Sequence, residues 1–355
     1  MEVTALLRPH IAKLSPYSSA RDEYSGKEGI FLDANENPFG DWVDGKYHRY
    51  PDPYQQAIKE KLSALKGIPA QRIFLGNGSD EAIDLLIRAF CEPNRDEVLL
   101  LPPTYGMYEV SAGINAVGIR RVPLTSDFQP DVAAIQAAVR PETKMLFLCS
   151  PNNPSGNKME RSALRQLIRE FPGIVVVDEA YIDFSDEPSF ITELDDFPNL
   201  VVIQTFSKAW GLANLRVGMA FSSEALIRVL NLIKPPYNIS GLTQEKVLQA
   251  LEQAEQLDGH VKSLLAERAF LEKALERSEF VEKVFPSHAN FILCKLPHAR
   301  AVYEGLLKQF IIVRDRSKVL LCADCLRISV GTREENEAFL AAFEQVAGTL
   351  AAEKL

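Results

Sequence analysis

The sequence predicts an α/β protein with a mostly parallel central sheet in a large domain and a smaller α+β domain at the C-terminal end. Three observations support this. Strands and helices alternate along most of the chain, as in successive βαβ units. The runs 143–151 and 173–181 are almost continuously apolar, which is typical of strands covered on both faces. The chain has 355 residues, 46% of them hydrophobic, enough for two domains and a large core.

The large domain, expected at 29–255, follows an N-terminal arm at 1–28 that proline and glycine interrupt. Amphipathic helices are predicted at 79–90, with Ser79 as the N-cap, and at 161–171. Apolar runs predict the strands of this domain, namely 72–76, 97–103, 143–151, 173–181, 199–208 and 216–223.

The small domain is expected at 256–355. A helical zone at 223–278, interrupted by Pro235 and Pro236, leads into it. Short strands are predicted within 280–296, 310–317 and 325–332, and a helix closes the chain. No change in composition marks the boundary near residue 255, so its position is a prediction without a linker signal.

Composition excludes several classes of protein. The net charge of −9 argues against a broad polyanion-binding surface, although local cationic pockets for small anions remain compatible with it. The N-terminal residues lack the pattern of a signal peptide, and no apolar run is long enough to cross a bilayer. Five irregularly spaced cysteines suggest reduced cytoplasmic thiols. Cys322 and Cys325 form a single CxxC without a second ligand pair, so no metal site is expected.

Lys208 follows the apolar run 199–207, where a lysine is most often an ordinary solvated residue. Other polar groups also stand at strand ends, where the chemistry of open α/β sheets is located. The turn "LGNGSDEA" (75–82) joins a strand to a helix start, which suits either a simple turn or a phosphate. These coincidences favour a functional lysine over a solvated one.

Three further groups suggest a planar aromatic ligand. Asn153 in "SPNNPSG" is either a turn former or an amide directed at a ligand oxygen. Asp178 ends an apolar strand and needs a partner, such as an ion pair or a protonated ring nitrogen. Tyr181 can donate a hydrogen bond to a phenolate, and Tyr105 can stack on a ring.

Together these residues describe a site for pyridoxal 5′-phosphate. Lys208 would form a Schiff base with the cofactor aldehyde and later act as general base. It needs a pKa lowered by desolvation and by cations such as Arg216. Asp178 would keep the pyridine nitrogen protonated, so that the ring accepts electrons from the substrate carbon.

The segments "SPNNPSG", "DEAY" and "TFSKAWGLANLRVG" (205–218) resemble the motifs of the class I and II aminotransferases, which are fold type I pyridoxal-phosphate enzymes. The resemblance covers nearly the whole chain. It implies that Lys208 is catalytic and that Asp178 pairs with the pyridine nitrogen. The cofactor contacts that it implies are Ser79, Asp80, Tyr105, Asn153, Asp178, Tyr181, Ser207, Lys208 and Arg216, together with Tyr50 from the other subunit of a homodimer.

The segments "LSPYSSAR" (14–21), "LDANENPFG" (32–40), "VRDRS" (313–317) and "LRISVGT" (326–332) are similar to the branch of this family that acts on histidinol phosphate. The substrates implied are histidinol phosphate and 2-oxoglutarate, giving imidazole acetol phosphate and glutamate. The substrate contacts implied are Tyr17, Asn37, Arg314 and Arg327. Guanidinium groups suit both the phosphate of one substrate and the carboxylate of the other.

Alternatives remain open at this stage. An aminotransferase for aromatic or other amino acids, or a threonine-phosphate decarboxylase, would have the same cofactor site. A transcription regulator that uses this domain as a sensor would carry an added basic DNA-binding module, which an acidic chain with a short N-terminal segment does not offer. For each arginine a structural ion pair is the alternative reading.

Overall fold

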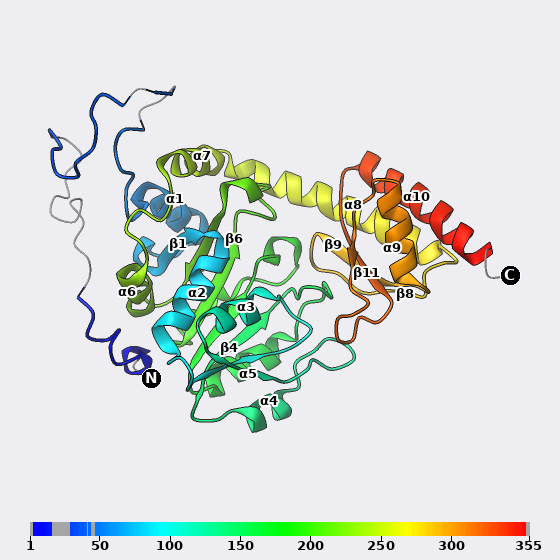
Figure 1. Cartoon of the computed structure of the whole chain (residues 1–355), viewed down its shortest axis with the longest axis horizontal. Coiled ribbons are helices and arrows are strands. Elements are labelled where there is room, and N and C mark those ends of the chain that lie inside the picture. Colours follow the sequence, from blue (N-terminus) through cyan, green and yellow to red (C-terminus); the bar gives the residue numbers. More distant parts are fainter. Residues whose placement is uncertain (1–2, 16–28, 41, 44–46, 353–355) are drawn as a thin grey trace.

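The computed structural model describes residues 3–15, 29–40, 42–43 and 47–352. These residues form a seven-stranded sheet and a four-stranded sheet, both packed against helices (Figure 1). The long helix α8 (Leu257–Arg277) runs from the side of the large sheet toward the small one (Figure 1). Within the described segments, no helix has the length and apolar character that a membrane span requires.

The large sheet has the strand order β1-β7-β6-β5-β4-β2-β3. Strands β3, β2, β4, β5 and β6 are parallel, whereas β7 is antiparallel to both of its neighbours. The prediction of a mostly parallel α/β sheet is therefore confirmed. The strands are β1 (Ile73–Asn77), β2 (Glu97–Leu100), β3 (Gly118–Arg121), β4 (Thr143–Cys149), β5 (Ile174–Asp178), β6 (Leu200–Thr205) and β7 (Val217–Phe221).

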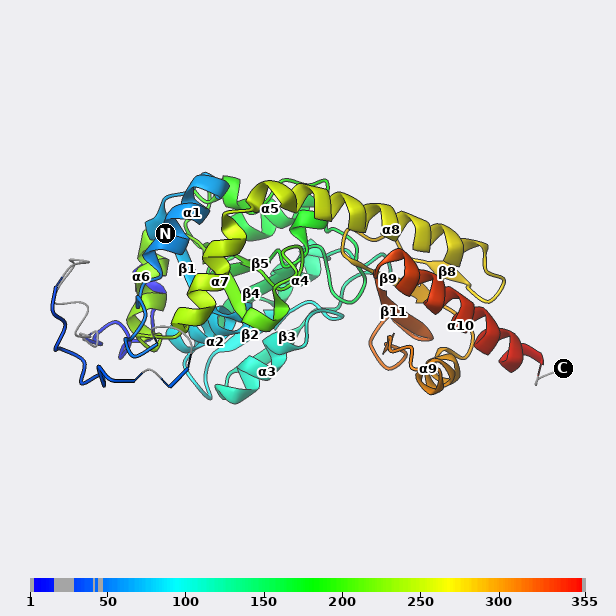
Figure 2. The ribbon, with the colours of Figure 1, turned by 90° about the horizontal axis from the view of Figure 1, so that it is seen from above.

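Both faces of this sheet are buried. Successive side chains of each strand point to opposite faces, so each strand contributes to the apolar clusters on both sides. In β4, Leu146 and Leu148 belong to one apolar cluster, and Met145 and Phe147 belong to the other. Figure 2 shows α5 on one side of the strands and α2 and α3 on the other. The first cluster contains residues of α1 (Gln56–Lys66), α4 (Val132–Ala138), α5 (Arg161–Glu170) and α7 (Gly241–Leu251). The second contains residues of α2 (Gly78–Phe90), α3 (Met107–Ile114) and α6 (Glu224–Ile233).

The small sheet is antiparallel throughout, in the order β10-β11-β9-β8. Its strands are β8 (Lys283–Val284), β9 (Phe291–Lys295), β10 (Arg314–Asp315) and β11 (Cys325–Ser329). Helices α8, α9 (Ala299–Lys308) and α10 (Arg333–Ala352) bury apolar side chains against it in a separate cluster. Short 3-10 helices lie at Val3–Leu6, Ala70–Arg72, Ile182–Phe184, Phe190–Glu193, Ala213–Leu215 and Ala254–Gln256.

The structure corrects two local predictions. Helix α2 begins at Gly78, with Asn77 at the N-cap position, so Ser79 lies inside the first turn and is not the cap. The strand expected over 310–317 shrinks to the two residues of β10. Phe310 adopts a left-handed backbone with φ of 60°, and the Ile312 side chain is 79% exposed, so neither residue extends the strand.

Candidate active site

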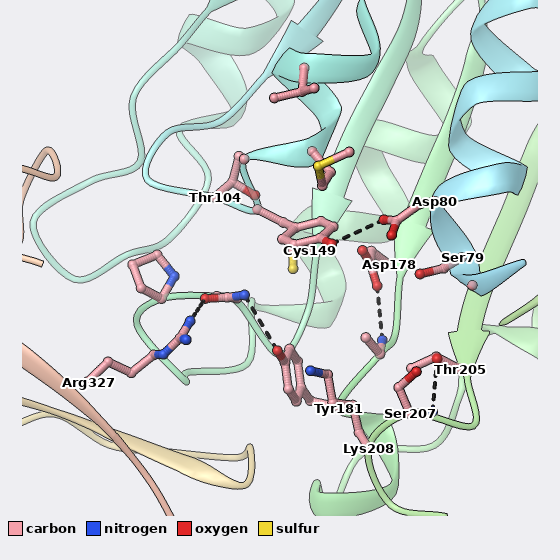
Figure 3. A pocket seen from close by; sticks show the side chains of 18 of the residues that line it. Ser79, Asp80, Thr104, Cys149, Asp178, Tyr181, Thr205, Ser207, Lys208 and Arg327 are labelled. Atoms are coloured by element: carbon pink, nitrogen blue, oxygen red, sulfur yellow. Dashed lines mark hydrogen bonds between the residues drawn. The ribbon is translucent and has the colours of Figure 1, made fainter. Parts of the chain in front are cut away.

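A cavity of about 610 Å³ lies between the carboxyl ends of β4, β5 and β6 and the small sheet. Ligands of open α/β sheets bind at such carboxyl ends. Figure 3 shows Asp178, Ser207 and Lys208 on one side of this pocket and Arg327 reaching in from another. The predicted site residues that line it are Ser79, Asp80, Tyr105, Asn153, Asp178, Tyr181, Ser207, Lys208, Arg216, Arg314 and Arg327.

One end of the pocket is built to hold an anion. The N–H groups in the first turn of α2 have no carbonyl partner within the helix, and they carry the positive end of its dipole. Arg216 lies against this turn: a Cβ placed on Gly78 would come within 2.7 Å of its Nη2. Its Nη1 also donates to Ser207 Oγ at 3.4 Å. Gly78 has a left-handed backbone with φ of 71°, which favours glycine, and a side chain there would have to displace the Arg216 guanidinium. This turn, Ser207 and Arg216 together form a cationic cradle.

Asp178 is a buried acid at the end of β5, with 3% of its surface exposed. Its Oδ2 accepts a hydrogen bond from the Tyr108 hydroxyl at 2.5 Å, and its Oδ1 accepts one from Ala180 N at 3.0 Å. Burial raises the pKa of Asp178 to about 6, which these hydrogen bonds only partly oppose. A cationic group placed beside this carboxylate would stabilise its ionised form.

Lys208 lies three residues beyond the end of β6, in a turn closed by a hydrogen bond from Gly211 N to its carbonyl oxygen. Its Nζ is 5.5 Å from the centroid of the Tyr181 ring. Burial lowers the pKa of Lys208, and the charges of Arg327 and, to a smaller extent, Arg216 lower it further. The lowered pKa expected from the sequence is confirmed, and it increases the share of nucleophilic amine at neutral pH.

Asn153 connects the two sheets. Its Nδ2 donates to Tyr181 Oη at 3.5 Å, and its Oδ1 accepts a hydrogen bond from Arg327 Nη1 (Figure 3). The Arg327 guanidinium lies 5.1 Å from the centroid of the Phe291 ring. Burial lowers the pKa of Arg327 to about 10, so this guanidinium is still charged at neutral pH.

Arg314 and Arg327 are direct cross-strand partners in the β10–β11 pair. Like charges that face each other in this way destabilise a sheet unless something neutralises them. In the described ranges, neither arginine forms an ion pair with a carboxylate, and the buried Nε of Arg327 has no hydrogen-bond partner. The pair therefore provides a second anion site, on the small-sheet side of the pocket.

Two of the predicted residues that the structure describes, Tyr50 and Asn37, do not line this pocket. Tyr50 lies elsewhere and stacks on Tyr237, with ring centroids 4.5 Å apart. Asn37 is exposed, and its side-chain oxygen accepts a hydrogen bond from Phe39 N at 3.0 Å. Tyr17 lies outside the described residues.

The sequence reasoning missed two residues that matter to the site. Tyr108, fully buried in α3 and stacked on Phe147, is a hydrogen-bond partner of Asp178. Its position three residues after Tyr105 was the available signal in the sequence. In the structure the Tyr105 hydroxyl donates to Asp80 and the Tyr108 hydroxyl donates to Asp178. Arg316 also lines the pocket, and its place two residues after Arg314 in the strand predicted over 310–317 was the corresponding signal.

The comparisons with known proteins agree with this geometry. The sequence profile of aminotransferase class I and II matches residues 36–343. The histidinol-phosphate aminotransferase of Cytophaga hutchinsonii is 55% identical over 95% of this chain and 97% of its own length. That of Parabacteroides distasonis is 52% identical over 96% of this chain and 98% of its own.

Solved structures share the fold. The histidinol-phosphate aminotransferase of Sinorhizobium meliloti in complex with pyridoxal-5′-phosphate has a TM-score of 0.79 at 24% identity, covering 86% of this chain and 84% of that one. The L-threonine-O-3-phosphate decarboxylase of Porphyromonas gingivalis has a TM-score of 0.72 at 22% identity, covering 84% and 90%. At such identities the structures establish the fold, and the profile match and the close relatives establish that this chain belongs to the class I and II aminotransferase family.

Proposed function

We propose that the protein transfers an amino group between histidinol phosphate and 2-oxoglutarate, giving imidazole acetol phosphate and glutamate, with pyridoxal 5′-phosphate as cofactor. This is the histidinol-phosphate transaminase reaction of histidine biosynthesis. The observation that carries the proposal is the similarity to relatives of that name, of which the one from Cytophaga hutchinsonii is 55% identical over 95% of the chain. The pocket supports it with a nucleophilic amine, a buried acid and two separate anion sites.

The cofactor fits this chain's residues. The cradle of Gly78, Ser207 and Arg216 would hold its phosphate, together with the backbone N–H groups of Ser79 and Asp80. A Cβ at Gly218 would lie 2.1 Å from Ser79 N, so a larger residue there would displace the turn. The steric demand at position 218 supports the view that the main-chain N–H groups of this turn take part in binding the phosphate.

The ring would lie between the cradle and Asn153. Asp178 would face the ring nitrogen, and the missing counter-charge of this acid is the reason to expect a protonated nitrogen there. Asn153 Nδ2 lies 3.5 Å from Tyr181 Oη, close enough for both groups to share the ring hydroxyl oxygen as a hydrogen-bond partner. Tyr105, whose hydroxyl donates to Asp80 at 3.1 Å, would place its ring against the cofactor face.

When bound, the cofactor supplies an aldehyde carbon and an electron-accepting ring. Lys208 would hold the cofactor covalently until substrate arrives. Its freed amine would then move the proton between the substrate carbon and the cofactor carbon. The lowered pKa of Lys208 suits both roles, because each one needs the unprotonated amine.

The substrate anion would lie at Arg314 and Arg327. Histidinol phosphate has no carboxylate, so its phosphate would occupy the site that receives a carboxylate of glutamate. The unpaired Nε of Arg327 supports this placement. Tyr17 and Asn37 are proposed as further substrate contacts on the resemblance alone.

A homodimer is part of the proposal. Residues 29–43 carry large apolar side chains that are mostly solvent-exposed in the single chain, and their described parts lie at the end away from the small sheet (Figure 1). These side chains are Ile30, Leu32, Phe39, Trp42 and Val43. An exposed apolar patch of this kind marks a protein contact. A second subunit would cover it and would bring Tyr50 to the cofactor phosphate of its partner.

Hybrid dimers test the role of Tyr50. Tyr50→Phe alone should weaken cofactor binding about 10–100-fold through loss of a hydrogen bond to a charged phosphate. A hybrid of one Lys208→Ala subunit and one Tyr50→Phe subunit should contain one intact site and recover about half the wild-type activity at limiting cofactor. If Tyr50 serves its own subunit, no intact site exists in that hybrid. Failure to recover activity, or a monomer in sedimentation, would contradict the proposal.

The substrate proposal is tested in single half-reactions. Histidinol phosphate, glutamate, aspartate, phenylalanine and threonine phosphate are added separately to the holoenzyme, and the absorbance of the cofactor is followed. We expect histidinol phosphate and glutamate to convert it to its aminated form. Preference for phenylalanine would favour an aromatic aminotransferase, and carbon dioxide release from threonine phosphate would favour a decarboxylase.

The remaining proposals concern organisation and location. We propose a large domain at 29–255 and a small one at 256–355, supported by the separate apolar cluster of the small sheet. Limited proteolysis that cuts far from residue 255 would argue against it. A cytoplasmic location is supported by five buried free cysteines, and cell fractionation tests it.

A further inference from the structure

Arg316 brings a third guanidinium to the substrate side of the pocket. Arg314 pairs with Arg327 in the sheet register, and Arg316 N donates to Cys325 O at 2.9 Å, which continues the same ladder. Residues two apart in a strand point to the same face. Arg316 lines the pocket together with Arg314 and Arg327.

Nothing in the described part of the chain neutralises Arg316 fully. Its Nε is buried without a hydrogen-bond partner, as is that of Arg327. The nearest acid along the chain, Asp315, is engaged elsewhere, by Arg300 Nη1 at 3.3 Å and by Ser317 N at 2.9 Å. Cys322, which lies close to Arg316, is a neutral thiol because burial raises its pKa to about 11.

Three guanidiniums need more negative charge than one carboxylate carries. Mutual repulsion and burial both disfavour the charged form of these groups. Burial lowers the pKa of Arg316, and the charge of Arg314 lowers it further. A phosphate monoester carries close to two charges at neutral pH and has three terminal acceptor oxygens. A carboxylate has one charge and two oxygens, which Arg314 and Arg327 alone can satisfy.

We propose that Arg316 is a specificity residue that makes the substrate site prefer a dianionic phosphate ester over a monoanionic carboxylate. This inference rests on the proposed function, which it deepens. Arg316 adds donors that the phosphate uses and that a single carboxylate of glutamate leaves unused.

The loop after β10 holds Arg316 in place. Arg316 O accepts from Val319 N at 2.8 Å, Val319 O accepts from Cys322 N at 3.0 Å, and Cys322 O accepts from Cys325 N at 3.0 Å. Both cysteines are buried in the apolar core. The CxxC thus anchors the turn that presents Arg316, and a backbone fixed in this way has less entropy to lose on binding.

The test compares two half-reactions in one variant. For Arg316→Gln, kcat/KM for histidinol phosphate should fall about 10–100-fold, the cost of losing hydrogen bonds to a charged group, while that for glutamate changes less than about threefold. Inhibition by inorganic phosphate should weaken in parallel. Arg316→Lys keeps the charge but lacks the two parallel donors of a guanidinium, so its kcat/KM for histidinol phosphate should lie between those of wild type and Arg316→Gln.

Lys318→Gln is the matched control, because it removes an equal charge from the same turn at an exposed position that does not line the pocket. It should leave kcat/KM for both substrates and the inhibition by inorganic phosphate unchanged. Equal losses for both substrates in Arg316→Gln, or no loss for either, would overturn the inference. An Arg316→Gln variant that does not fold leaves the decision to Arg316→Lys, in which an unchanged substrate ratio overturns it. If wild-type enzyme fails to turn over histidinol phosphate, the proposed function itself is wrong.

Discussion

Lys208→Ala abolishes amino transfer in both directions, with a loss of at least about 10²–10⁴-fold from the missing proton carrier alone. The reason is positional. Lys208 is an amine in this pocket whose pKa is lowered by burial and by neighbouring cations, and it lies 5.5 Å from the Tyr181 ring centroid. The loss is measured as the rate of the cofactor absorbance change with histidinol phosphate and with glutamate. Borohydride reduction of wild-type holoenzyme should fix the cofactor to Lys208, as peptide mapping would reveal.

The fold of the Lys208→Ala variant should be intact. The wild-type lysine has no ion pair in the described part of the chain, so its removal breaks none, and the melting temperature should not fall. Lys158→Ala is a suitable control because Lys158 pairs with Asp186 at 2.8 Å on the surface. That variant should keep full activity. Transamination by Lys208→Ala at a substantial rate, or a borohydride label on another residue, would remove the mechanism.

The strands that carry the site could be predicted because they are buried on both faces. In β4 and β5 every residue except Lys144 is buried, so the apolar runs identify them without ambiguity. Two of the elements that were not identified have weaker patterns. β3 has the sequence GIRR and lies at the sheet edge, and α4 has only seven residues. For such short or polar elements, tertiary contacts decide the structure more than local pattern does.

The site itself was predictable to the extent that its residues stand at strand ends. Asp178 and Lys208 follow this rule, because parallel strands place their carboxyl ends along one edge. Tyr108 does not, since it reaches Asp178 across 70 residues of sequence from a helix packed on the sheet. The pairing of Arg314 with Arg327 depends on a two-residue strand whose register the sequence does not specify.

The buried acid links function to stability. Without a cationic partner, an ionised Asp178 is costly in the folded protein, so its pKa is raised from 3.8 to about 6. The folded state therefore binds more protons than the unfolded state between these values. The stabilising effect of the protonated acid is complete below pH 3.8 and is lost as the pH rises through 6. From pH 4 to pH 8 the loss is about 2–3 kcal/mol.

Asp178→Asn should separate the effect of Asp178 on catalysis from its effect on stability. The amide fits the same place, because its oxygen can accept from Ala180 N while its nitrogen donates to Tyr108. In the holoenzyme we expect kcat to fall about 10²–10³-fold, the usual loss for a group that stabilises developing charge. The rate of the half-reaction with glutamate measures it.

In the cofactor-free protein the same substitution should stabilise the fold at pH 8. Because the neutral amide does not ionise, the variant should lack the decline of about 2–3 kcal/mol that wild type shows between pH 4 and pH 8. Urea unfolding of both proteins, stripped of cofactor, at pH 4, 6 and 8 measures the difference. Adding the cofactor at pH 8 should raise the free energy of unfolding of wild type more than that of the variant, because only the carboxylate gains a counter-charge. Parallel pH profiles for the two stripped proteins would mean that Asp178 is already ionised and balanced without the cofactor, and the charge pairing assigned to it would be wrong.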